Sequence, residues 1–249
     1  MNTDLTYNMI FKRKSFHFFR ETEIIYDNEL EMIKEKINNL KPLYNNIKTE
    51  IRLIPATNNK RGEEYQILFY SENKENYLQN IGYIGEQLDL FFASLNIGAL
   101  WYGIGKPDIQ TYNELDYVIM ILISKMPSDK FRKDMFKSKR KSLDEIWFGD
   151  YHKNIGKIAR FAPSACNTQP WKVVSNNNSL TIYRYKMPGK RGIMPVNKVI
   201  YYNRIDIGIF LYILETCLSY NKLEYQKELF IDNSDDDIEE TLIAKYNIN

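Results

Sequence analysis

The sequence predicts an α+β fold built from two related halves. Each half contains β-branched and aromatic runs that are typical of strands, together with a long apolar stretch that has helical spacing. Landmarks also repeat at a nearly constant offset, since Gly85 stands 123 residues before Gly208 and Pro42 stands 121 residues before Pro163. Such an offset indicates an internal duplication, with coincidence among common helix residues as the alternative.

The first half is predicted to carry two helices and three strands. The helices are expected over 28–40 and 76–95, and the strands over 50–54, 64–70 and 117–123. The last strand is the longest apolar run of the chain. It is far too short to cross a bilayer and is typical of a buried central strand.

The second half is predicted to contain two helices, two strands and an acidic region. The helices are expected over 143–161 and 202–220, the strands over 171–175 and 180–185, and the acidic region over 232–240. The stretch 205–218 is apolar almost all round, so we expect it to be buried on most sides. We expect the two long helices of the chain to pack together, with Gly85 and Gly208 allowing close backbone approach.

A basic stretch separates the halves. Residues 125–142 contain eight lysines and arginines against two aspartates. Such a run is typical of a solvated linker, while phosphate contact by a few residues and a nucleic-acid patch are alternatives. We therefore expect a first half at 1–125, a linker at 126–142 and a second half at 143–249, together forming one compact unit.

Composition excludes several classes of function. The formal net charge of +2 over 249 residues indicates no nucleic-acid or membrane partner. Two cysteines and two histidines are too few for a disulfide framework or a metal cluster. Residues 1–14 lack the apolar core of a secretory signal. We therefore expect a cytoplasmic protein without a metal site.

Residues 162–171, Ala-Pro-Ser-Ala-Cys-Asn-Thr-Gln-Pro-Trp, form the most informative stretch. Pro163 cannot continue a helix, and Gln169 precedes a proline that favours extended geometry at the residue before it. Ser164 and Asn167 can offer side-chain hydrogen bonds, and the small residues around them would let a planar ligand come close. A purely structural turn from helix to strand is the alternative.

A second candidate segment lies near the N-terminus, at 11–19. Arg13 and Lys14 stand beside the hydroxyl of Ser15, and a guanidinium, an ammonium and a neutral donor together can hold a phosphate. The same three residues are common on protein surfaces, which is the alternative.

These segments resemble the nitroreductase family of FMN enzymes. The loop 162–171 is similar to the family's Ala-Pro-Ser-x-x-Asn-x-Gln-Pro-Trp loop, and 13–19 is similar to its Arg-Arg-Ser-x-Arg-x-Phe segment. Residues 85–105 resemble its central helix and Gly-rich segment, and 140–145 its C-terminal basic segment. The resemblance implies a nitroreductase-like α+β fold with two pseudo-repeated halves, central antiparallel-type sheets and long buried central helices. The arrangement resembles a fused pseudo-dimer of the TM nitroreductase type, expected to be a monomer with one flavin site formed from both halves.

The resemblance also implies which residues hold FMN. They are Arg13, Lys14, Ser15, His17, Gly103, Ile104, Arg140, Pro163, Ser164, Ala165 and Asn167. Backbone N–H of Gly103 or Ile104 would meet flavin N5, and Arg140 would reach the phosphate. His17 stands where the family has a cation, and a neutral imidazole would stabilise reduced flavin less than a permanent cation.

The function implied is that of an FMN-dependent NAD(P)H oxidoreductase. A ping-pong cycle would pass hydride through flavin N5 to a small-molecule acceptor such as a nitroaromatic or a quinone. The flavin would carry the chemistry without a catalytic side chain, which agrees with the scarcity of histidine and cysteine. Cys166 is then interpreted as a packing residue rather than a redox group. A non-enzymatic flavin-binding protein and an interaction protein with an empty site are the alternatives.

Overall fold

The chain forms two compact units. The computed structural model describes residues 2–57, 59–185, 192–234 and 240–249. The first unit comprises Met1–Tyr77 and Ile84–Met135, and the second comprises Leu78–Tyr83 and Phe136–Asn249. The long helix α3 (Tyr77–Ser94) therefore gives its first turns to the second unit and the rest to the first. The division after Met135 falls inside the basic stretch 126–142, which the sequence predicts to be a linker.

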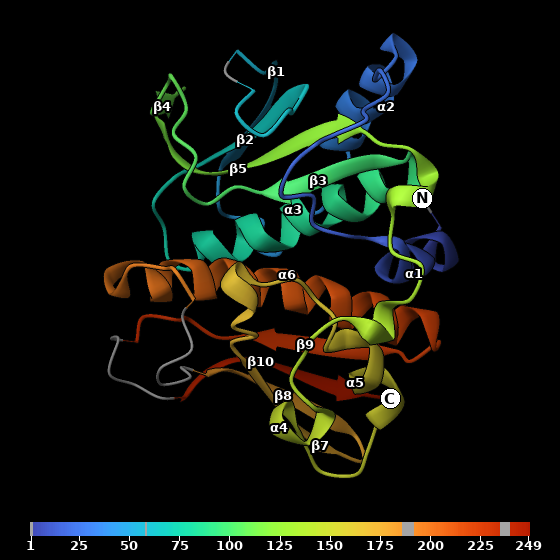
Figure 1. The fold of residues 1–249 in the computed structure, drawn as a ribbon. Helices are drawn as coiled ribbons and strands as arrows, with labels where there is room; N and C mark the ends of the chain where they lie inside the picture. Colours follow the sequence, from blue (N-terminus) through green and yellow to red (C-terminus); the bar gives the residue numbers. More distant parts are fainter. Residues whose placement is uncertain (1, 58, 186–191, 235–239) are drawn as a thin grey trace. The chain divides into compact units, whose positions relative to one another are not determined.

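The first unit is an antiparallel sheet that lies along helix α3 (Figure 1). Its strand order is β1-β2-β5-β3, and the short β4 pairs with β5. The strands are β1 (Thr49–Pro55), β2 (Tyr65–Ser71), β3 (Ile97–Trp101), β4 (Thr111–Tyr112) and β5 (Leu115–Lys125). Helices α1 (Thr3–Lys12) and α2 (Asp27–Asn38) complete the unit. The strands predicted in this half are present at nearly the expected bounds, and so are both helices.

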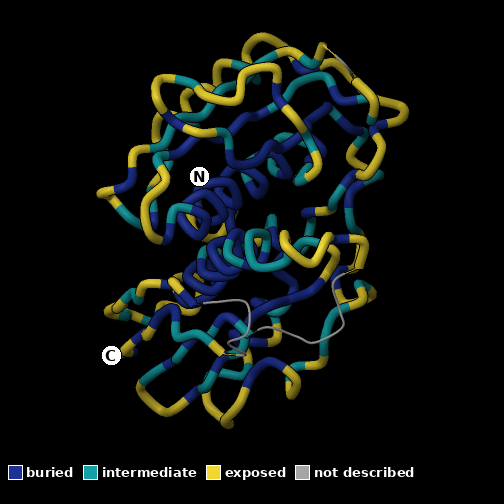
Figure 2. Tube along the Cα trace, turned by 90° about the vertical axis from the view of Figure 1, so that its left-hand side faces the viewer, coloured by how far each residue is buried: buried dark blue, intermediate teal, exposed yellow. Residues whose placement is uncertain are grey.

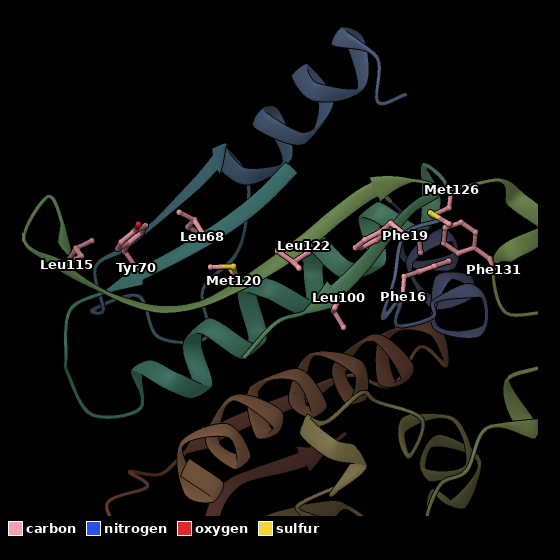
Figure 3. Close-up of a cluster of buried hydrophobic side chains, with 11 residues drawn as sticks. Phe16, Phe19, Leu68, Tyr70, Leu100, Leu115, Met120, Leu122, Met126 and Phe131 are labelled. Carbon is pink, nitrogen blue, oxygen red and sulfur yellow. The ribbon is translucent and has the colours of Figure 1, made fainter. Parts of the chain in front are cut away.

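Cross-strand pairs build the apolar core of the first unit. Leu68 of β2 lies opposite Met120 of β5, and Leu100 of β3 lies opposite Leu122 of β5. Because side chains alternate along a strand, these four share one face of the sheet (Figure 3). Phenylalanines from the segments before β1 and after β5 pack onto the same cluster: Phe16, Phe19 and Phe131. Each fully buried side chain of this size contributes about 1.5–3 kcal/mol.

The second unit has a five-stranded sheet with the order β6-β7-β8-β10-β9. All neighbours in it are antiparallel except β6 and β7, which pair in parallel. Its strands are β6 (Trp147–Phe148), β7 (Trp171–Asn176), β8 (Ser179–Tyr185), β9 (Tyr225–Leu229) and β10 (Glu240–Ile248). Its helices are α4 (Leu143–Ile146), α5 (Lys153–Ala159) and the long α6 (Val199–Tyr220). The α+β class predicted from the sequence is therefore confirmed.

Helix α6 is buried along most of its length (Figure 2). Glycines let its backbone approach the first turns of α3. A Cβ on Gly208 would lie 1.9 Å from the carbonyl oxygen of Gln79, and one on Gly82 would lie 2.0 Å from that of Ile205. The close approach predicted at Gly208 is confirmed, but the prediction for Gly85 is wrong. The space beside Gly85 is filled by the Trp101 ring. The residue of α3 that meets α6 is Gly82, about one turn closer to the N-terminus of the helix.

Several predicted elements differ from the structure. The helix expected over 143–161 is interrupted, because Gly149 (φ +98°) and His152 (φ +53°) adopt left-handed backbone between α4 and α5. Strand β10 begins at Glu240, the last residue of the expected acidic region, of which residues 235–239 lie outside the described residues. Within that region Asp232 is buried and bound to Arg184, with Nε–Oδ2 at 2.7 Å and Nη2–Oδ1 at 3.0 Å. Among the described residues, no helix combines the length and apolar character that crossing a membrane requires.

Candidate functional site

The loop between α5 and β7 has an unusual backbone. A 3₁₀ turn spans Ala165–Asn167, and three residues of the loop have positive φ: Cys166 at +48°, Asn167 at +57° and Gln169 at +49°. None of these is a glycine, so each conformation costs energy that the surroundings must supply. Strain of this kind clusters at binding sites, which makes the loop a candidate functional site.

The extended geometry predicted at Gln169 is wrong. The residue is held in left-handed backbone by contacts from both sides. Its N–H donates to Ser164 Oγ at 2.9 Å, and its side-chain Oε1 accepts from the Lys141 N–H at 3.0 Å. Its carbonyl accepts from Lys141 Nζ at 2.8 Å. These tertiary hydrogen bonds override the local preference that the following proline imposes.

The second unit brings Arg140 and Asn167 together. The guanidinium donates through Nη1 to Asn167 Oδ1 at 2.8 Å, and Asn167 Nδ2 donates to the Lys139 carbonyl at 3.1 Å. A further bond of 3.5 Å joins Arg140 Nη2 to the carbonyl of Phe161. Asn167 is exposed and Arg140 is half-buried, so a cation and an amide lie side by side at the edge of the loop.

The remaining predicted residues of the loop support its backbone. Pro163 is buried at its start, and Ser164 and Ala165 are half-buried. Asp206 of α6 accepts the Ala165 N–H through Oδ1 at 2.9 Å, and Thr168 Oγ1 donates to the carbonyl of Ala165 at 3.0 Å. Sequence reasoning missed Asp206, although an aspartate that opens the apolar stretch 205–218 is a visible signal.

In the first unit, Arg13 is buried in an ion pair. Its Nε donates to Asp89 Oδ2 at 2.7 Å, and its Nη2 donates to Ser15 Oγ at 3.1 Å. Trp101 Nε1 also donates to Asp89 Oδ2, at 3.0 Å, and Glu86 Oε1 lies 3.8 Å from Arg13 Nε. Burial opposes the charge of Arg13, but the carboxylates of Asp89 and Glu86 raise its pKa above the ordinary value. Burial, followed by the charge of Asp89, raises the pKa of Glu86 well above its usual range.

The other predicted residues of the first unit lie nearer the surface. Lys14 is exposed and donates from Nζ to the Lys130 carbonyl at 3.0 Å, and His17 is exposed. Ser15 is half-buried and forms a parallel bridge with Ala99 of β3.

Gly103 and Ile104 form the turn that follows β3, where Gly105 N–H donates to the Tyr102 carbonyl at 3.1 Å. The side chain of Ile104 is 66 % exposed. Contact of these first-unit residues with a flavin stays a prediction.

Within each unit the structure gathers only part of the predicted set. In the second unit, Arg140 and Asn167 are joined directly, while Pro163, Ser164 and Ala165 shape the same loop. In the first unit, Arg13 meets Ser15. Among the described residues, no group of three or more His, Cys, Asp and Glu side chains is placed to hold a metal ion.

Comparisons with known proteins found a matching family model and similar solved structures. The family model described as "Putative TM nitroreductase" matches residues 5–217. The fold is similar to that of a solved "putative nitroreductase" from Thermotoga maritima, at a TM-score of 0.61 and 20% identity over 100% of this chain and 93% of that one. A nitroreductase with bound FMN from Desulfitobacterium hafniense is similar over 57% of this chain and 100% of its own, at a TM-score of 0.41 and 15% identity. No curated protein matches the sequence.

Proposed function

Because the chain belongs to the TM nitroreductase family, we propose that it is an FMN-dependent oxidoreductase that uses NAD(P)H to reduce a small organic acceptor. A nitroaromatic compound or a quinone is the class of acceptor that we propose. The family supports the reaction type, and the loop of the second unit supports the cofactor.

The observation that carries the proposal is the pairing of Arg140 with Asn167 on the strained loop. A flavin ring presents both acceptors and an N–H donor along its pyrimidine edge. An asparagine amide can donate and accept, and a guanidinium donates several hydrogen bonds in one plane. The neighbouring side chains of Pro163, Ser164 and Ala165 are small enough for a planar ring to reach the backbone. The donor set of this loop therefore fits FMN.

Charge near the loop fits the phosphate as well. Arg140 is flanked by Lys139 and Lys141, so three consecutive cations precede α4. Cations of this kind form charge-assisted hydrogen bonds with phosphate oxygens. In the first unit, the charge of Arg13 is balanced by Asp89, so we do not propose Arg13 as a phosphate ligand.

When bound, FMN supplies the redox chemistry, taking hydride from NAD(P)H and passing electrons to the acceptor. The residues of the chain then bind and orient. We propose that Asn167 fixes the ring edge and that Arg140 balances negative charge on the cofactor. Ser164 holds the loop through the Gln169 N–H.

The test is the visible absorption spectrum of the purified protein before and after addition of FMN and desalting. We expect a near-equimolar amount of flavin, bleached by NADH or NADPH. Arg140→Met should weaken FMN binding about 10- to 100-fold, the usual effect of losing a hydrogen bond that involves a charged group. Asn167→Ala loses a neutral hydrogen bond to the ring and should weaken binding about 2- to 10-fold. Asn178→Ala and Lys157→Met change exposed residues of the same unit and serve as matched controls.

A wild-type protein that retains no added FMN would overturn the proposal and favour a fold without a cofactor. Bound flavin that NADH and NADPH both fail to reduce would leave a flavin-binding protein without the proposed activity.

A further inference from the structure

Asp206 connects the long helix α6 to the candidate loop. The residue is 3 % exposed, and its Oδ1 accepts the N–H of Ala165 at 2.9 Å. Its Oδ2 lies 3.5 Å from Thr168 Oγ1, which also lies 3.3 Å from Asn203 Oδ1 on the same helix. The carboxyl group therefore spans the two ends of the 3₁₀ turn that contains Asn167.

The loop needs such a support because of its backbone. Cys166, Asn167 and Gln169 all have positive φ, a conformation that persists only where neighbouring contacts fix it. Asp206 supplies an acceptor for Ala165, the residue directly before the first strained position. Removing that acceptor would leave the partly buried Ala165 N–H without its hydrogen bond and would leave the backbone strain uncompensated.

Burial disfavours the charge of Asp206. It raises the pKa of the carboxyl group to about 8, against the lowering effect of the bonds from Ala165 and Thr168. Among the described residues, the titratable or charged groups on the elements around Asp206 are Cys166 and Tyr202, with Arg140, Lys141 and Arg204. Of the cations, Arg140 bonds to Asn167, Lys141 to Gln169 and Arg204 to Asp232. The carboxyl group therefore lies in the closed loop chiefly as the neutral acid at pH 7.

We propose that neutral Asp206 is a positioning residue that holds the loop 163–169 in its binding conformation, and that rising pH loosens this loop and weakens FMN retention. The part concerning FMN rests on the function proposed above. An ionised Asp206 would be hydrated in an opened loop but not in the closed one. Closure is therefore fully favoured below the ordinary aspartate pKa of about 4, and the advantage falls as pH rises to about 8. Because one proton is involved, the equilibrium constant for loop closure can fall by at most about tenfold per pH unit.

The test measures hydrogen exchange in the FMN-free protein, over a peptide that contains the loop, between pH 5.5 and 8.5. After correction for intrinsic exchange, wild-type protection should fall with pH by up to about tenfold per unit. Asp206→Asn keeps an acceptor for Ala165 but cannot ionise, so its protection should be high and independent of pH. Asp206→Leu lacks the acceptor and should be poorly protected at every pH. Asp150→Asn, an exposed acid of the same unit, should follow wild type.

FMN affinity is measured over the same pH range and expressed as the ratio of Asp206→Asn to wild type, which cancels titration of the FMN phosphate. We expect this ratio to rise with pH. Wild-type protection that is flat with pH, or equal protection in Asp206→Asn and Asp206→Leu, would overturn the positioning role. A constant affinity ratio would overturn the link to FMN. Absence of FMN binding at any pH, with the exchange results as expected, would refute the proposed function and leave the positioning role standing.

Discussion

Arg13→Met should destabilise the first unit far more than the adjacent substitution Lys14→Met. The guanidinium of Arg13 is 3 % exposed and is bound to the equally buried Asp89 at 2.7 Å. Its removal leaves the Asp89 carboxylate with the Trp101 N–H as a neutral donor and with Glu86 nearby. Lys14 is exposed, so replacing it with methionine should reduce the stability only slightly.

The expected loss follows from the cost of an unpaired buried charge. Removing one partner of a buried ion pair costs about 3–5 kcal/mol, whereas the whole stability of a domain is about 5–15 kcal/mol. At about 1.4 kcal/mol per factor of ten, the unfolded fraction should rise roughly 100- to 4000-fold. Lys14→Met should stay within about 1 kcal/mol of wild type, as surface substitutions do.

The assay is urea unfolding followed by circular dichroism and by tryptophan fluorescence, with separate fits if the two units unfold in separate transitions. The double variant Arg13→Met/Asp89→Leu removes both charges of the pair and should recover part of the loss, because the two replacing side chains are apolar. If the free energy of unfolding of Arg13→Met lies within about 1 kcal/mol of the wild-type value, the ion pair between Arg13 and Asp89 does not stabilise the unit by the expected amount. Additive effects of the two substitutions would refute the coupling between them.

Two further substitutions test the packing of each unit. Leu122→Ala removes a fully buried side chain opposite Leu100 and should cost about 2–5 kcal/mol in urea unfolding; a loss below 1 kcal/mol would contradict its place in the core. Gly208→Leu would force α6 away from the Gln79 carbonyl, since even a Cβ would lie 1.9 Å from it, and should cost about 1–3 kcal/mol or more. Unchanged thermal stability of this variant would show that the helices do not meet there.

Local sequence patterns were sufficient for most of the regular structure. The strands predicted over 64–70 and 117–123 are runs whose β-branched and aromatic residues fit a pleated, buried surface. The first is offset by one residue from β2, and the second lies within β5. Strand β3, by contrast, contains Gly98 and follows a helix directly, so its pattern resembles a turn. Strand β3 forms because it pairs with the edge of β5. That pairing joins distant parts of the chain, so it cannot be predicted from a short stretch of sequence.

The candidate site was predictable where it is local in sequence. Prolines and small residues made the loop 162–171 visible as one segment. The partners that decide its chemistry lie far along the chain, since Asp206 is 41 residues from Ala165 and Asp89 is 76 residues from Arg13. An arginine in a motif looks the same whether or not a distant carboxylate neutralises it. The sequence could therefore propose Arg13 as a phosphate ligand but could not show its ion pair.

Two buried aspartates of the second unit should give its stability a maximum in the mildly acidic range. Hydrogen bonds and charge from Arg184 outweigh burial and lower the pKa of Asp232. Its contribution to stability is therefore present above about pH 4 and is lost as pH falls through the lowered value. Asp206 behaves in the opposite way, because burial raises its pKa to about 8. Its contribution is complete below about pH 4 and declines as pH rises toward 8.

Substitution separates the two effects. In urea unfolding between pH 3 and 9, Asp206→Asn should remove the decline in stability between about pH 4 and 8, whose slope in wild type is at most about 1.4 kcal/mol per pH unit. Asp232→Asn should instead flatten the acid side, at the cost of lower stability at neutral pH because Arg184 loses a charged partner. A decline between about pH 4 and 8 that persists unchanged in Asp206→Asn would mean that this carboxyl group is hydrated in the folded protein. The proposal that neutral Asp206 holds the loop 163–169 would then fail as well, because it requires the carboxyl group to be shielded from water.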